Sequence, residues 1–187
     1  MLYDGLRTSD AQAKMAQSDI VKANPGWMVE PRLLSPPGAG AHPRAMAIDV
    51  SLKNKSGTLI DMGTEFDFLA QEQGMNKNPA HRAYKNMKPE HAKNQQILTL
   101  AMIEASELLG MDLLPYSEEW WDFRFKKEVY EQFAPLSDSD LPPEMQMVNT
   151  VTADDFNDKY EPRVKDLISD IQKLSDIAPI ITSPEAG

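Results

Sequence analysis

The sequence predicts an α+β domain, in which a small antiparallel sheet has helices packed on it. Two β-capable runs, residues 45–52 and 58–62, flank a Gly-containing turn at residues 53–57, and this pattern favours a hairpin. The strongest helical patterns, residues 92–109 and 161–177, lie apart from that hairpin along the chain. Short strands in hairpin order with segregated helices are typical of α+β folds.

Ahead of the hairpin we expect one helix and one strand. Residues 8–23 have a helical pattern in which Ser9 and Gln12 fit a capping box, and the Asn24-Pro25-Gly26 stretch ends it. Residues 27–34 fit a strand that is closed by the Pro36-Pro37-Gly38 turn.

Two of the predicted strands carry acids. Asp49 lies in the middle of the apolar run 45–52, where an acid is costly unless it has a partner. Alternation along residues 120–125 puts three side chains on one face of a strand: Trp120, Asp122 and Arg124.

The remaining elements follow from periodicity. Residues 72–90 are polar and irregular, and are long enough to form a functional loop over a site. Residues 92–109 are apolar around most of the helix circumference and end before Gly110, so we expect a largely buried helix that lies across the sheet. Residues 161–177 predict an amphipathic helix that begins with Pro162.

Composition excludes several classes of function. The 187 residues carry a net charge of −10, and without a cluster of Lys and Arg we expect neither nucleic acid nor an anionic membrane as a partner. No apolar run approaches the roughly 20 residues that span a bilayer. The first residues lack the features of a signal peptide, which favours a cytoplasmic protein, or a periplasmic one if a signal is missing from this chain. The sequence favours no particular oligomeric state.

The three histidines and the absence of cysteine leave few ways to hold a transition metal. His42 and Asp49 form a His-x6-Asp pair, and a later Glu119-Trp120-Trp121-Asp122 stretch carries two more acids. Taken alone, each pattern favours a structural interpretation. His42 and Asp49 would form an ion pair, and the two tryptophans would pack in the core while the acids on either side of them face solvent. Arg7 beside Asp4 would ordinarily be a surface ion pair that contributes little.

Together, these segments resemble the zinc D-alanyl-D-alanine dipeptidases of the vancomycin-resistance type. Residues 42–49 are similar to their Ser-x-His-x-x-Gly-x-Ala-x-Asp signature, and residues 119–121 to the start of their Glu-Trp-Trp-His motif. Residues 4–7 resemble their Asp-Gly-Tyr-Arg segment, residues 62–67 their Met-Gly-x-x-Phe-Asp segment, and residues 94–102 their Asn-Arg-Arg-Leu-Leu helix. The five matches come in the family's order.

The resemblance implies a fold and a set of roles. The fold is shared with bacterial wall-lytic peptidases and the hedgehog signalling domain. The implied metal ligands are His42, Asp49 and, at the third position, Asp122, while Glu119 would be the general base that activates water. Arg7 would stabilise the oxyanion. Asp67 would hold the free amino group of a dipeptide, with Asp4 also at the substrate.

The chain departs from the family at three positions. Asp122 replaces the third ligand, a His, and the additional carboxylate makes Mn²⁺ or Fe²⁺ more competitive with Zn²⁺ and the metal a weaker Lewis acid. His81 and His91 are alternative third ligands. Gly40 replaces a Ser that helps to hold the substrate carboxylate, and Ala45 replaces the Gly of the signature.

The resemblance also divides the chain. Residues 1–145 would form the metallopeptidase-like domain, and residues 146–187 an extension with one amphipathic helix and a mobile tail. Family members usually carry a further segment ahead of the Arg-bearing motif, so the chain is either naturally short or lacks that segment; in the second case the helix at 161–177 would cover the surface left exposed.

Two classes of function remain open at this stage. The first is a zinc-type dipeptidase or carboxypeptidase that acts on D-Ala-D-Ala or another small cell-wall peptide, with one metal ion per chain. The alternative is a non-catalytic peptide-binding member of the same fold, which Asp122, Gly40 and Ala45 favour. A weaker third possibility is a peptidoglycan hydrolase that works on longer wall peptides.

Overall fold

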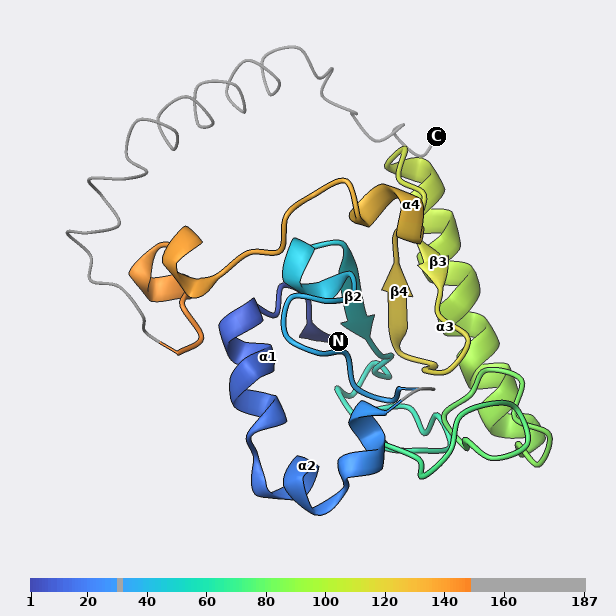
Figure 1. Ribbon diagram of the computed structural model, residues 1–187. Helices are drawn as coiled ribbons and strands as arrows, with labels where there is room; N and C mark the ends of the chain where they lie inside the picture. The colour runs from blue at the N-terminus through green and yellow to red at the C-terminus, as the bar shows by residue number, and fades with distance from the viewer. Residues whose placement is uncertain (30–31, 149–187) are drawn as a thin grey trace, which may run out of the picture.

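The computed structural model describes residues 1–29 and 32–148 (Figure 1). The predicted α+β class is confirmed: a four-stranded antiparallel sheet in the order β1-β2-β4-β3 lies among helices. The strands are β1 (Leu2–Asp4), β2 (Ala47–Val50), β3 (Leu114–Pro115) and β4 (Asp122–Arg124). The α-helices are α1 (Ser9–Ala16), α2 (Asp19–Ala23), α3 (Pro89–Leu108) and α4 (Lys127–Tyr130), and short 3-10 helices cover Pro25–Met28, His42–Arg44, Asp138–Asp140 and Pro143–Met145.

The register of the two central strands separates a polar face from an apolar face. Asp49 of β2 is paired with Asp122 of β4, and Ile48 is paired with Phe123. Because neighbouring side chains of a strand point to opposite faces, the two acids share one face of the sheet. Phe123 is fully buried on the other face, in the hydrophobic core that includes Trp120, Trp121, Val50, Met62 and Leu98.

Helix α3 contributes to that core through a narrow stripe. In Figure 1 it runs alongside β3 and β4, and Leu98 and Gln95 are its buried contacts there, the Gln95 amide donating to the Met62 carbonyl at 2.8 Å. The prediction of a largely buried helix is wrong, since apolar residues such as Leu100 and Leu108 are 58% and 81% exposed. The predicted end is right, because Gly110 adopts the left-handed φ of +66° that favours glycine.

The amino-terminal elements differ from the sequence-based expectations. The predicted helix over residues 8–23 is two helices, α1 and α2, with a break at Gln17 and Ser18. The cap is Thr8, whose hydroxyl accepts from the Ala11 amide at 3.2 Å, because the helix starts at Ser9. The 3-10 helix Pro25–Met28 takes the place of the first residues of the strand expected at 27–34, since the fixed φ of Pro25 suits a first helical position.

The predicted hairpin is only partly formed. Residues 53–59 do turn, and Lys53 and Leu59 make an isolated bridge, but no ladder extends beyond it. Strand β2 pairs with β4 on one side and with the amino-terminal strand β1 on the other, and β1 brings Asp4 opposite Asp49. The predicted helix at residues 161–177 lies outside the described residues. Within the described part, no helix has the length and apolar character needed to cross a membrane.

Candidate metal and substrate site

Two strands and one tight turn bring His42 between two acids. His42 stands on the 3-10 helix that leads into β2, and its Nδ1 lies 2.8 Å from the Gly5 carbonyl oxygen. That contact favours a proton on Nδ1 and leaves Nε2 to face the acids, as a donor when the ring is protonated and as a metal ligand when it is neutral. Nε2 faces Asp49 Oδ1 at 3.5 Å and Asp122 Oδ2 at 3.3 Å.

These separations are long for hydrogen bonds but suit a shared cation. With metal–ligand distances of about 2.0–2.1 Å, neighbouring ligand atoms of a tetrahedral site lie about 3.3–3.4 Å apart. Asp49 Oδ1 is also buried without a hydrogen-bond partner in the described residues. A buried carboxylate oxygen needs a donor or a cation, so His42 and Asp49 fit a metal ion.

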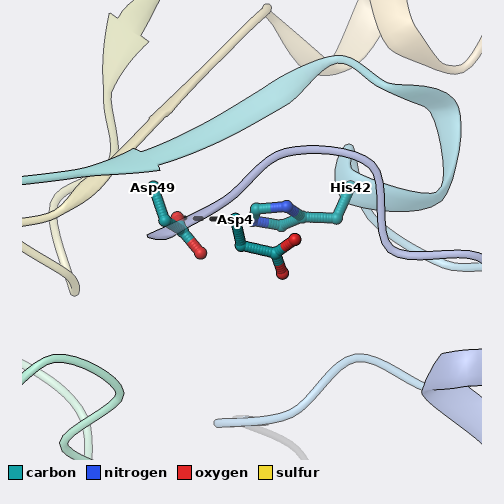
Figure 2. A group of neighbouring side chains, drawn as sticks. All are labelled: Asp4, His42 and Asp49. Carbon is teal, nitrogen blue, oxygen red and sulfur yellow. Dashed lines mark ion pairs between the residues drawn. The ribbon is translucent and has the colours of Figure 1, made fainter. Parts of the chain in front are cut away.

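Asp4 is the third acid at this point. The ligand atoms of Asp4, His42 and Asp49 all lie within 4.8 Å of one another, and Figure 2 shows the three side chains converging. Asp4 also accepts hydrogen bonds from the Gly5 amide and from Arg7 Nε, both at 2.7 Å. Arg7 Nη2 reaches Asp49 Oδ2 at 3.6 Å, so one guanidinium joins both acids.

Asp122, predicted as the third ligand, is engaged from two sides. It is fully buried, and Arg124 donates a hydrogen bond to each of its carboxylate oxygens: Nε donates to Oδ1 at 2.8 Å, and Nη2 donates to Oδ2. Burial opposes the charged carboxylate, yet the hydrogen bonds from His42 and Arg124 outweigh it and lower the pKa of Asp122. Asp122 is not part of the Asp4–His42–Asp49 group.

The electrostatics of this cluster are those of a site with surplus negative charge. Burial works against a charged imidazole, but the contact with Asp122 and the nearby Asp49 carboxylate raise the pKa of His42 to about 10. Burial raises the pKa of Asp49. The acids thus hold a proton on His42 when no other cation is at hand.

A pocket with a cavity volume of about 50 Å³ lies over the cluster and opens to solvent. The residues that line it include five of the predicted site residues: Arg7, His42, Asp49, Asp67 and Glu119. The carboxylates of Glu119 and Asp67 accept no hydrogen bond from the described residues. Burial and the nearby charge of Asp122 raise the pKa of Glu119 to about 8.

Asp67 has a feature that sequence reasoning missed. Its φ is +59°, in the left-handed region that non-glycine residues seldom adopt, although Asp does so more readily than most. Such strain is often found where a side chain must be held at a functional position.

The turn that carries Glu119 is held by Arg82, which the sequence analysis did not single out. Its guanidinium donates to the carbonyls of Tyr116 at 2.8 Å and Asp122 at 2.9 Å, and to Thr99 Oγ1 of α3 at 2.8 Å. The one sequence feature that could have indicated a role for Arg82 is its position in the polar 72–90 loop. Through Arg82, that loop fixes both ends of the turn that carries Glu119.

The other two histidines lie in different contacts. His81 Nε2 is 3.5 Å from Glu118 Oε1, and His91 Nε2 is 3.1 Å from Asp61 Oδ2. Neither belongs to the group of ligand atoms around His42.

The fold, the paired acids and the histidine between them are those expected of a metallopeptidase domain. The sequence model of the D-ala-D-ala dipeptidase family matches residues 1–138. The chain therefore belongs to the D-ala-D-ala dipeptidase family, which confirms the resemblance inferred from its motifs. Peptidases of this family depend on a metal ion.

The chain is also similar to the D-alanyl-D-alanine dipeptidase of Escherichia coli (strain K12). The two are 28% identical over 123 residues, which are 66% of this chain and 53% of the relative. The chain thus spans about half the length of the curated relative that it matches.

Proposed function

We propose that this chain is a metal-dependent peptidase that hydrolyses a small peptide of the D-Ala-D-Ala type. The observation that carries the proposal is the buried Asp49 Oδ1, which lies beside His42 Nε2 and has no hydrogen-bond partner among the described residues. His42 and Asp49 would hold one divalent ion, with Asp122 as the third ligand. The family favours zinc, and the surplus of oxygen donors also admits manganese or iron.

A metal ion at these ligands supplies Lewis acidity toward the scissile carbonyl and toward water. Glu119 lines the pocket, and its carboxylate accepts no hydrogen bond from the described residues. It would take the proton of the attacking water. Arg7 lines the same pocket and would meet the negative charge that develops on the carbonyl oxygen. Asp67 would hold the free amino group of the peptide.

The test is metal content and turnover in matched variants. In the parent we expect about one zinc, manganese or iron per chain by elemental analysis, and release of D-alanine from D-alanyl-D-alanine. Glu119→Gln should keep the metal and lose turnover by at least roughly a hundredfold, in line with the loss of a general base. Equal turnover in parent and Glu119→Gln would defeat the assignment.

The third ligand is tested in the same series. Asp122→Ala should lose the metal and Asp4→Asn should keep it, if Asp122 completes the site. The reverse result would assign the third ligand to Asp4, which lies within 4.8 Å of the His42 and Asp49 ligand atoms.

The second candidate is a non-catalytic peptide-binding domain of the same fold. The observation in its favour is the ion pair of Asp122 with Arg124, which already neutralises the carboxylate that a metal would need. No metal in the parent, with zinc appearing only in Asp122→His, would make this the leading interpretation.

A further inference from the structure

Arg124 is a cation of the site that the family motifs do not include. It lies on β4 two residues after Asp122, so both side chains leave the same face of the strand. The Tyr116 ring lies under its guanidinium, with the ring centroid 3.8 Å from Cζ. Asp122 binds one edge of the guanidinium through Nε and Nη2. Two side chains thus fix the orientation of Arg124.

One edge of this guanidinium remains available. An arginine presents five N–H donors in a rigid fork, and the Asp122 carboxylate takes only two of them. Nη1 donates no hydrogen bond to any of the described residues. The Arg124 side chain is 21% exposed and lines the pocket together with Glu119 and Asp67. The free edge is therefore a preformed donor pair at the edge of the pocket.

The charges around the pocket show what such a donor pair would bind. The acids that line it are Asp49, Asp67 and Glu119, and its other arginine, Arg7, is already shared between Asp4 and Asp49. A zwitterionic dipeptide presents one ammonium and one carboxylate. The acids suit the ammonium, whereas a carboxylate among them needs a cation with free donors.

The backbone near the pocket strengthens the need for such a cation. Gly40 has no hydroxyl to offer, and its φ of +85° disfavours any side chain there. An added Cβ would also come within 3.2 Å of the Ser35 hydroxyl, a tight contact. The carboxylate of a bound peptide must therefore be held by other groups that line the pocket.

We propose that Arg124 is the specificity-determining residue that binds the terminal carboxylate of the peptide through its free guanidinium edge. The inference rests on the proposed function for the site and names the end of the substrate that the site recognises. It restricts the substrates to peptides with a free carboxyl terminus beside the scissile bond.

The experiment measures binding rather than turnover, so that it can be read even if the chain does not hydrolyse peptides. D-alanyl-D-alanine and its carboxy-terminal amide are titrated by NMR into the full chain carrying Glu119→Gln, with metal content measured in every sample. The same titrations are run with Arg124→Lys, which keeps a positive charge for Asp122 but lacks the planar fork. Lys126→Met is the matched control, since Lys126 pairs with Asp112 outside the pocket.

We expect the free acid to bind at least about tenfold more tightly than the amide, as a charge-assisted bidentate contact predicts. Arg124→Lys should reduce this ratio to within about threefold and leave metal content unchanged, whereas Lys126→Met should preserve the ratio. Equal binding of acid and amide by the parent, or an unchanged ratio in Arg124→Lys, would overturn the proposal. If Arg124→Lys lost both the metal and the binding of the dipeptide, the proposal would also be overturned, because Arg124 would then act only by positioning Asp122.

Failure of the proposed function gives a different result. A parent that turns over no dipeptide but still prefers the acid through Arg124 would keep this inference and favour the peptide-binding domain. A parent that binds neither compound would overturn it.

Discussion

At the scale of single residues, Ala45 occupies a backbone position that suits glycine. Its φ is +53°, and its side chain is exposed, so the Cβ makes no packing contribution that offsets the strain. An L-residue pays roughly 1–2 kcal/mol in this region, and glycine in turn loses about 0.4–1 kcal/mol through the unfolded chain. We therefore expect Ala45→Gly to raise the free energy of unfolding by about 0.5–1 kcal/mol, measured by urea denaturation.

The control is Ala39→Gly, at a position without a positive φ in the same loop. It should be destabilising or neutral. Stabilisation by both changes would show that Ala45 is not the cause. The finding also explains why the family signature has Gly at this position: the turn after His42 needs a left-handed residue to enter β2.

At the scale of elements, Arg82 ties the turn before β4 to α3. Its half-buried guanidinium lies over the Phe123 ring, 4.5 Å from the ring centroid, and desolvation lowers its pKa to about 10. Arg82→Met would leave the Tyr116 carbonyl without its donor, whereas the Asp122 carbonyl would keep the Tyr116 amide at 3.0 Å. We expect a loss of about 1–3 kcal/mol in the free energy of unfolding, the usual cost of one unsatisfied buried acceptor.

Urea denaturation measures this loss, and Arg82→Lys should lie between parent and Arg82→Met because it keeps the charge without the fork. Lys77→Met is the matched surface change, since Lys77 pairs with the exposed Glu72, and should shift stability by less than about 0.5 kcal/mol. An Arg82→Met protein as stable as the Lys77→Met protein would contradict the assigned role.

At the scale of the whole molecule, Asp10 joins the first helix to the far end of the described chain. Its Oδ2 accepts from the Ser137 hydroxyl at 2.7 Å and from the Asp138 amide at 2.8 Å, and these hydrogen bonds lower the pKa of Asp10. A lowered folded-state pKa stabilises the fold above the ordinary value of about 4, and this stabilisation is lost as pH falls through the folded-state pKa.

Asp10→Asn should therefore reduce the free energy of unfolding by about 1 kcal/mol near pH 7. The difference from the parent should stay constant between roughly pH 5 and 7 and shrink below about pH 4. Denaturation curves at several pH values test this. A difference that grows toward low pH would contradict the sign of the pKa shift.

Local sequence patterns were sufficient for several features of the fold and the site. Gly110 marked the end of α3, and strand alternation placed Asp122 and Arg124 on one face. Periodicity failed for α3, because the apolar residues around its circumference exceed the narrow stripe that the small sheet can cover. The strand expected from Trp27 onward also failed at its start, because a 3-10 helix that begins at Pro25 includes Trp27 and Met28.

Motif spacing and the two-residue repeat of a strand are local properties, so the family and the strand face that carries the acids can be inferred from the sequence alone. Which acids meet depends on how the strands pair. The pairing of β2 with β4 sets Asp49 beside Asp122, and the pairing with β1 brings in Asp4. Those pairings join segments that are far apart in the chain, and such contacts form only when the whole molecule packs. The hydrogen bonds from Arg124 to Asp122 could not be predicted from the sequence either, since two side chains on the same face of a strand need not be in contact.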